Sequence, residues 1–281
     1  MSNIDISALQ EFVGREEMRA DQVHQSAVDQ FRNTLGPYLL AETVEFVPPG
    51  FHWTLFQPVA PTDDLGSDGH PKSLGILPEM PLPSRMWAGG DVALLAPFQI
   101  GGHVQRKTRV EKIETKSGSS GPLLFITLAH ETSSDQTMMV REKQHLVYRT
   151  PAPPSPPKGA AIGQSEGLTF ETDPRLLFRY SALTFNSHRI HYDQDYARNV
   201  EGYRDLVVHG PLQATMMLNY IAGSLGHARL GMRYRGVAPL YVHERATVCR
   251  SGDTSGRVWV ERYSGQLTMT GEYGAPEDLG Q

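Results

Sequence analysis

The feature that most constrains this chain is a proline-rich stretch at residues 151–157, near the middle of its 281 residues. Five of these seven residues are proline. Proline lacks an N–H group and has a fixed φ, so this stretch cannot join a helix interior or a central strand, and it forms a stiff, extended connector. We therefore predict a linker over 151–158 between an N-terminal domain, 1–150, and a C-terminal domain, 159–281.

The composition is that of an ordinary globular protein, with a net charge of -5 and no basic tract of the kind that binds nucleic acid. The sequence has no apolar run of membrane-spanning length and no pattern of a signal peptide, so a cytoplasmic location is expected. Cys249 is the only cysteine, which excludes an intrachain disulfide and a cysteine-based zinc site. We interpret it as a buried core residue in a strand.

Both predicted domains combine helices with antiparallel strands, which indicates an α+β fold. In the first domain we expect a helix at 21–35 ended by Gly36-Pro37, a long loop at 59–83, and strands at 103–114, 123–132 and 137–149. In the second we expect a strand at 175–183, a polar turn and short helix within 186–199, a helix at 211–225, and strands at 240–249 and 257–270 joined by a turn at 251–256. Loops as long as 59–83 are often functional.

Two segments of the C-terminal domain carry chemically useful residues. Asn186 and His191 are five positions apart, so they converge only if Asn186 lies in a turn and His191 begins the next helix. Histidine exchanges protons near neutral pH, and the asparagine amide can hold a water or a thioester oxygen. The pair would also suit a helix cap and a buried turn, and that interpretation stays open.

The second segment, residues 207–211, leads into the predicted helix at 211–225. Gly210 followed by Pro211 is typical of a helix start, where free N–H groups can polarise a carbonyl. Together the two segments meet the needs of adding water to an α,β-unsaturated thioester. His191 would take a proton from water, and the Gly210 N–H would stabilise the enolate-like oxygen.

These motifs resemble a known family. RYSALTFNSHRIHYD (179–193) and LVVHGPLQ (206–213) are similar to the MaoC-like double-hotdog hydratases, and most nearly to the branch of mesaconyl-C4-CoA (3-methylfumaryl-CoA) and itaconyl-CoA hydratases. Mitochondrial-type 3-hydroxyacyl-thioester dehydratases are also similar, and PSRMWAGG (83–90) looks like part of the N-terminal hotdog. The resemblance implies a double hotdog, in which two antiparallel sheets each wrap around a central helix.

The resemblance also assigns roles to residues. R-specific enoyl-CoA hydratases have aspartate where this chain has Asn186, so acid–base work would fall mainly on His191, with Gly210 supplying the oxyanion N–H. His188 replaces a family asparagine, which leaves open whether it assists catalysis or packs. The family uses no metal, so His188 and His191 are not expected to bind one, and no cofactor is expected.

Further side chains are candidates for substrate binding. Arg85 is our preferred partner for a substrate carboxylate, and Arg189 is a second candidate for a carboxylate or the CoA phosphates. Trp87 is expected to form core or pocket wall. The N-terminal hotdog is expected to bind the acyl chain without catalysing the reaction.

The expected activity is that of a hydro-lyase. It would reversibly hydrate a short, branched, dicarboxylic enoyl-CoA, with mesaconyl-C4-CoA or itaconyl-CoA favoured, in itaconate and mesaconate metabolism. The alternatives are a 3-hydroxyacyl-thioester dehydratase of fatty acid synthesis, a non-catalytic acyl-thioester-binding module and a hotdog thioesterase, although the last usually needs a carboxylate that the motif lacks. An acyl-CoA substrate and a homodimer are expected, with neither nucleic acid nor membrane as a partner.

Overall fold

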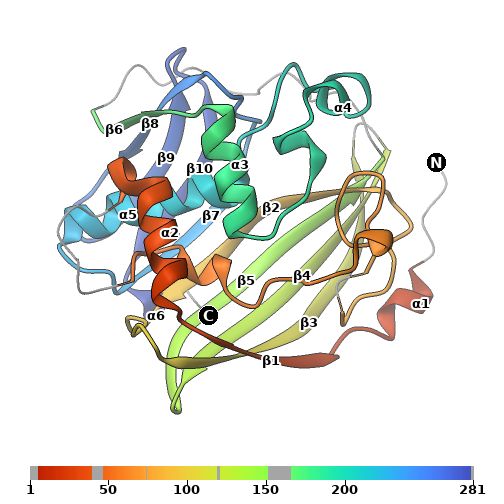
Figure 1. The fold of residues 1–281 in the computed structure, drawn as a ribbon, viewed down its shortest axis with the longest axis horizontal. Helices are drawn as coiled ribbons and strands as arrows, with labels where there is room; N and C mark the ends of the chain where they lie inside the picture. Colours follow the sequence, from red (N-terminus) through yellow and green to blue (C-terminus); the bar gives the residue numbers. More distant parts are fainter. Residues whose placement is uncertain (1–5, 40–46, 74, 119–120, 151–165, 280–281) are drawn as a thin grey trace.

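The structure is a computed structural model that describes residues 6–39, 47–73, 75–118, 121–150 and 166–279 (Figure 1). The linker predicted at 151–158 lies outside the described residues. Within them, ten antiparallel strands form one sheet in the order β1-β3-β4-β5-β2-β7-β10-β9-β8-β6. The sheet is continuous from the first half of the chain into the second, because β2 pairs with β7.

The strands of each half stay together in the sheet. The first half supplies β1 (Glu16–Gln22), β2 (Ser84–Leu94), β3 (His103–Gly118), β4 (Gly121–Ser134) and β5 (Thr137–Arg149). The second half supplies β6 (Leu168–Glu171), β7 (Leu230–Gly236), β8 (Arg245–Arg250), β9 (Gly256–Arg262) and β10 (Leu267–Gly274). Buried and less buried residues alternate along β4, as expected for a strand with one face on the core. The strands expected at 103–114, 123–132 and 137–149 are confirmed as β3, β4 and β5.

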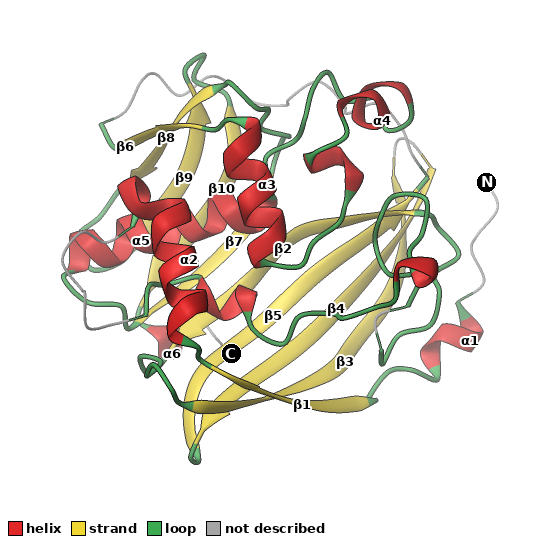
Figure 2. Cartoon of the chain, in the orientation of Figure 1, coloured by secondary structure: helices red, strands yellow, loops and turns green. Residues whose placement is uncertain are grey.

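The main helices lie against one side of the curved sheet (Figure 2). In the second half, α5 (Gly210–Leu225) packs on β2, β7, β8, β9 and β10. It is buried along most of its length, as the centre of a wrapped sheet must be, and Gly226 ends it with a left-handed φ of 73°. In the first half, α2 (Gln25–Leu35) buries Val28, Phe31 and Leu35, which share one face at helical spacing.

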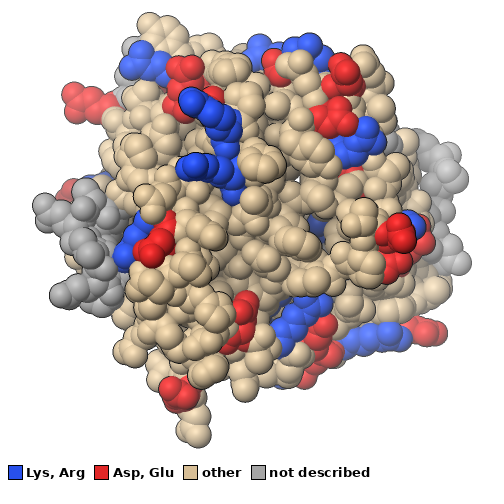
Figure 3. Space-filling view, in the orientation of Figure 1, with Lys and Arg blue, Asp and Glu red and all other residues tan. Residues whose placement is uncertain are grey.

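Shorter helices complete the chain. The α-helices are α1 (Ser7–Gln10), α3 (Pro174–Leu183), α4 (Gln194–Asn199) and α6 (Pro276–Leu279). The 3-10 turns are η1 (Gly36–Tyr38), η2 (Phe51–Thr54), η3 (Thr62–Asp64) and η4 (Arg189–His191). Among the described helices, none is long and apolar enough to cross a membrane. On the face drawn in Figure 3, acidic and basic side chains lie interspersed.

One apolar core joins the two halves. It contains Phe31 from α2, Met216 from α5, Val92 from β2 and Met232 from β7. Cys249 is fully buried, as predicted from the sequence. Because residues of both halves share this core, the sheet and its helices form one packed unit.

The segment 175–183, which we predicted to be a strand, is helix α3. Asp173 caps its first turn by accepting the Leu176 N–H at 2.9 Å, and Pro174 occupies the first turn. Both features favour a helix start. The buried Leu177, Tyr180 and Ser181 lie at helical spacing, whereas the apolar residues on the other face, such as Phe178, are exposed. The exposed apolar residues concealed the helical period in the sequence.

The boundaries of two strands and one helix also differ from the predictions. The strand expected at 257–270 is a hairpin, in which β9 and β10 are separated by a turn with Gly265 at a φ of 80°. The strand expected at 240–249 begins only at Arg245, because residues 241–243 turn toward the segment before α5. The helix expected from residue 21 begins at Gln25, since residues 21 and 22 still pair with β3.

Candidate active site

A cavity of about 660 Å³ opens between the two halves. Its walls come from β2 to β5 on one side, and from residues 184–188, 190 and 191 and the start of α5 on the other. Most of the predicted site residues line it, namely Asn186, His188, His191, Gly210, Arg85 and Trp87. Residues far apart in the sequence therefore meet around one space large enough for a small acyl group.

His191 ends the 3-10 turn η4 and is buried. Its Nδ1 lies 2.7 Å from the Val207 carbonyl oxygen. A carbonyl can only accept, so Nδ1 carries the proton and Nε2 has a free lone pair. Burial lowers the pKa of His191 to about 4, while the Val207 carbonyl acts in the opposite direction. At neutral pH the ring is therefore uncharged and able to accept a proton.

Asn186 lies in a tight turn before η4. Its N–H donates to the Ser181 carbonyl at 2.8 Å, and its Oδ1 accepts the His188 N–H at 3.0 Å. The preceding Phe185 has a φ of 48°. The amide oxygen therefore shapes the turn, as the capping interpretation requires, and the amide nitrogen remains as the group that can donate into the cavity.

Gly210 is the first residue of α5 and lines the cavity. The helix start has no side-chain cap, and Pro211 has no N–H to offer. The preceding His209 is held by Ser181, whose Oγ lies 2.8 Å from Nε2, and its ring stacks on that of His191 at 3.6 Å. His209 therefore supports the ring of His191 and fixes the chain at the point where Gly210 meets the cavity.

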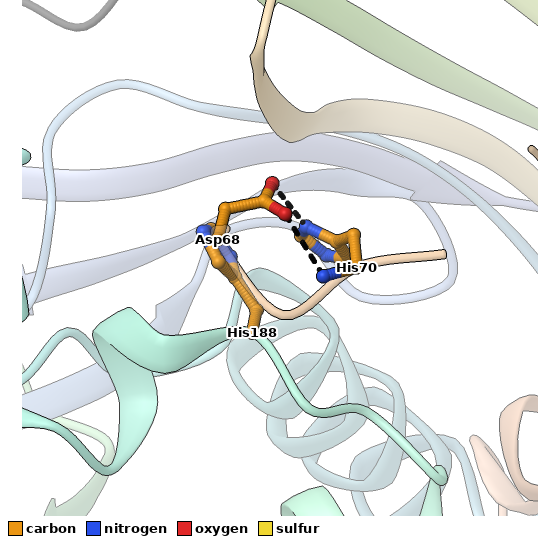
Figure 4. A group of neighbouring side chains, drawn as sticks. All are labelled: Asp68, His70 and His188. Atoms are coloured by element: carbon orange, nitrogen blue, oxygen red, sulfur yellow. Dashed lines mark hydrogen bonds and ion pairs between the residues drawn. The ribbon is translucent and has the colours of Figure 1, made fainter. Parts of the chain in front are cut away.

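His188 links His191 to a residue pair that sequence reasoning missed. Its ring lies 5.4 Å from the His191 ring and 4.1 Å from the ring of His70. His70 lines the cavity and its Nδ1 lies 3.0 Å from a carboxylate oxygen of Asp68 (Figure 4). Both residues belong to the loop at 59–83 that we expected to be functional. Its length was a signal, but the sequence did not indicate which residues of the loop reach the site.

One ligand atom from each of Asp68, His70 and His188 lies within 4.8 Å of the others. Such a group could hold a cation in another setting. Here burial and then the nearby Arg85 guanidinium lower the pKa of His70. Burial, His70 and His191 lower the pKa of His188, with a smaller contribution from Arg85, and the charge of Arg85 would repel a metal ion. We assign no metal to this group.

The cavity wall carries several arginines. Among the described residues, no carboxylate lies within ion-pair distance of Arg85, Arg106 or Arg149, and the Nε atoms of Arg106 and Arg149 are buried without a hydrogen-bond partner. Of the acids in the wall, Glu17 pairs with Arg19, and burial raises the pKa of Glu142 to about 7. The cavity therefore favours an anionic ligand.

The structure does not bring Arg189 into the cavity wall. Its guanidinium pairs with Asp193 at 2.7 Å and lies over the Tyr196 ring at 4.0 Å. Trp87 does line the cavity, with its ring edge-on to that of Trp53 at 5.7 Å. Trp87 thus lies where a pocket-wall residue was expected.

Comparisons with known proteins give a consistent result. Residues 50–242 match the family described as hydroxyacyl-thioester dehydratase type 2. A mesaconyl-C(4)-CoA hydratase of Chloroflexus aurantiacus is 39% identical over 246 residues, which cover 86% of this chain and 87% of the relative. A mitochondrial hydroxyacyl-thioester dehydratase type 2 of Schizosaccharomyces pombe is 26% identical over 88% of this chain and 93% of its own.

Solved structures support the fold. HtdX of Mycobacterium tuberculosis superposes with a TM-score of 0.70 at 16% identity, covering 93% of this chain and 100% of its own. A second protein of Mycobacterium tuberculosis, described as having a double hotdog fold, gives a TM-score of 0.53 at 13% identity over 94% of this chain and 96% of its own. The expected α+β double hotdog is confirmed.

Proposed function

The chain belongs to the hydroxyacyl-thioester dehydratase type 2 family, and from this premise we propose that it reversibly adds water to an α,β-unsaturated acyl-CoA. The observation that carries the proposal is the arrangement of His191. Its Nδ1–H is held by the Val207 carbonyl, which leaves Nε2 as a proton acceptor in a cavity that Gly210 also lines. A hydro-lyase needs these two functions, a base for water and a donor for the thioester oxygen.

The proposed reaction proceeds by conjugate addition. The water oxygen bonds to C3 while His191 Nε2 takes one of its protons. The electrons of the C2=C3 bond move onto the thioester oxygen, where the Gly210 N–H stabilises the negative charge. C2 then takes up a proton and the thioester carbonyl is restored. Asn186 cannot transfer a proton, and we assign it the holding of the water through its amide nitrogen.

We favour a short, branched, dicarboxylic substrate such as mesaconyl-C4-CoA or itaconyl-CoA. The relative with 39% identity is named as a mesaconyl-C(4)-CoA hydratase. Arginines of the described wall that form no ion pair support the same choice, since a guanidinium matches a carboxylate in two parallel hydrogen bonds. Arg85 is our candidate for this contact, because it lies near His70 and His188, beside the proposed base.

Dehydration of 3-hydroxyacyl thioesters in fatty acid synthesis is the second candidate. It is supported by the family description and by the mitochondrial relative of fission yeast. Both candidates use the same water chemistry and differ in the acyl chain. The CoA-linked reaction also leads us to propose a cytoplasmic enzyme. We retain the homodimer as a proposal, to be checked by light scattering in solution.

A substrate panel tests the proposal. Conjugated enoyl-CoAs with and without a second carboxylate are mixed with the enzyme, and the loss of enoyl absorbance and the release of free thiol are followed together. We expect loss of absorbance without thiol, fastest with a dicarboxylic substrate. Release of thiol would instead indicate a thioesterase, and faster turnover of monocarboxylic chains would favour the second candidate.

A pair of variants tests the assigned base. His191→Ala should lower kcat by about 10²- to 10⁴-fold, the usual contribution of a general base. His227→Ala, which removes an exposed histidine beyond α5, is the matched control and should keep the wild-type rate. Wild-type turnover by His191→Ala would show that another group activates the water.

A further inference from the structure

A short segment of the first half, residues 66–70, is fixed on the turn that leads to His191. The Asp68 carbonyl accepts the Arg189 N–H at 2.8 Å, and the Gly69 carbonyl accepts the Ser187 hydroxyl at 2.5 Å. Gly69 has a φ of +89°, and a Cβ there would lie 1.9 Å from the Ser187 carbonyl oxygen. Only glycine allows this close contact, so the position of the segment is specified by the sequence.

The segment presents an aspartate–histidine pair at the cavity. One carboxylate oxygen of Asp68 accepts the backbone N–H of His70 at 2.9 Å, and the other lies 3.0 Å from the ring nitrogen Nδ1 of His70. The side chains of Asp68 and His70 are only 10% and 11% exposed. A carboxylate accepts, so the shared proton lies on Nδ1 and Nε2 remains free to exchange a proton.

Water addition needs two proton transfers, one from the water and one to C2. His191 serves the first, and the amide of Asn186 does not titrate. Among the described histidines around His191, His209 is held by Ser181, and the Nε2 of His188 is buried without a hydrogen bond. Of these described histidines, His70 is the one whose ring nitrogen lies within hydrogen-bond distance of a carboxylate, and this contact orients the ring and stabilises its charged form.

We propose that His70 is the second acid–base residue of the active site, exchanging the proton at C2, and that Asp68 is its positioning residue. This inference rests on the proposed hydration reaction. In the addition direction, the water oxygen bonds to C3 while His191 Nε2 takes the water proton, and His70 Nε2–H then gives its proton to C2. One water is added, and one proton has moved from His70 to His191, from which it returns through solvent.

Substrate charge is linked to this step. Burial, and then the charge of Arg85, lower the pKa of His70, so the ring is uncharged at neutral pH. A substrate carboxylate bound to Arg85 offsets that repulsion and favours the imidazolium form, which Asp68 also stabilises. A dicarboxylic substrate thus helps to charge the group that protonates it, whereas a monocarboxylic one does not.

The test measures proton transfer at C2 in the dehydration direction. Wild type, His70→Gln and Asp68→Asn are assayed with a 3-hydroxyacyl-CoA that carries hydrogen or deuterium at C2. We expect His70→Gln to lower kcat by about 10²- to 10⁴-fold and to raise the isotope effect above that of wild type, because breaking the C2–H bond becomes slower than the other steps. Asp68→Asn should change both quantities in the same direction and by less.

Asp64→Asn, an exposed acid in the same loop, is the matched control and should leave both quantities unchanged. A wild-type rate in His70→Gln, or a lower rate with an unchanged isotope effect, would overturn the inference while leaving the proposed function intact. A wild-type enzyme that forms no enoyl thioester would overturn the proposed function itself, and this inference with it. Thermal unfolding of each variant separates loss of the fold from loss of proton transfer.

Discussion

Gly210→Ala is the substitution that best separates the proposed chemistry from the fold. The φ of Gly210 is not left-handed, and a Cβ there would lie 3.6 Å from the Trp87 carbonyl oxygen and 3.9 Å from Met269 Cε. Both are ordinary van der Waals distances. Alanine is also a better helix former than glycine, so the free energy of unfolding should change by no more than about 1 kcal/mol.

The effect on catalysis should be much larger. Gly210 lines the cavity, and an added methyl group would occupy space that the thioester oxygen needs in order to reach the N–H. Loss of one oxyanion donor lowers kcat by about 10²- to 10³-fold, or about 3 to 4 kcal/mol of transition-state stabilisation. The effect should appear in kcat more than in KM, since the charge on the oxygen develops only during the reaction.

The assay follows loss of enoyl absorbance and thermal unfolding of the same preparations. Gly36→Ala is the matched control, because a Cβ at Gly36 meets nothing within 4 Å and the residue does not line the cavity. It should keep both rate and stability. A Gly210→Ala enzyme with a wild-type kcat would refute the assignment of the oxyanion donor, and one that unfolds at a much lower temperature would refute the packing argument.

Three further predictions concern the loop and the buried titratable groups. Gly69→Ala should lower the free energy of unfolding by about 1 to 3 kcal/mol and reduce kcat by displacing His70. Hydrogen exchange at the Arg189 N–H should become faster, and an unchanged exchange rate would contradict the contact between residues 66–70 and the turn before His191. Glu142→Gln should make the protein more stable than wild type at pH 8, by up to about 3 kcal/mol, but not at pH 4. The pKa of Glu142 is raised to about 7, so ionisation of this one group costs stability as pH rises through that value, and the glutamine removes that cost. The free energy of unfolding, measured with denaturant, should fall as pH drops below 6.5, because the unfolded chain binds protons that the folded chain excludes. An uptake of fewer than two protons on unfolding would contradict this prediction. The histidines whose pKa the fold lowers are His52, His70, His130, His188, His191 and His209.

The sequence predicted those parts of the site that depend on local chain geometry. The spacing of Asn186 and His191 predicted Asn186 in a turn and His191 at the start of the next helix. The turn is confirmed, but His191 ends the 3-10 turn η4 and the helix α4 begins only at Gln194. Gly210 with Pro211 marked the helix start, which lies one residue earlier than expected. Such features follow from turn and cap preferences within a few residues, and these can be read without knowing the fold.

The other parts of the site depend on contacts between segments that are distant in the sequence. The partner of His191 Nδ1 is a backbone carbonyl 16 residues away, which carries no side-chain signal. His70 reaches the site because Gly69 lies against Ser187, 118 residues along the chain. The error over 175–183 had a local cause, since a short apolar run suits either a strand or a helix, and only the Asp173–Pro174 start signal favours the helix.

The pairing of β2 with β7 joins two hotdog units of one chain into one sheet. Two identical subunits related by a twofold axis would each have to carry every residue of their shared site, and any change in one would appear in both. Within a single chain the two units can change separately. The wall formed by β3 to β5 can thus adapt to new acyl groups while the turn that holds His191 stays as it is, so a new substrate can be accommodated without rebuilding the site of water addition.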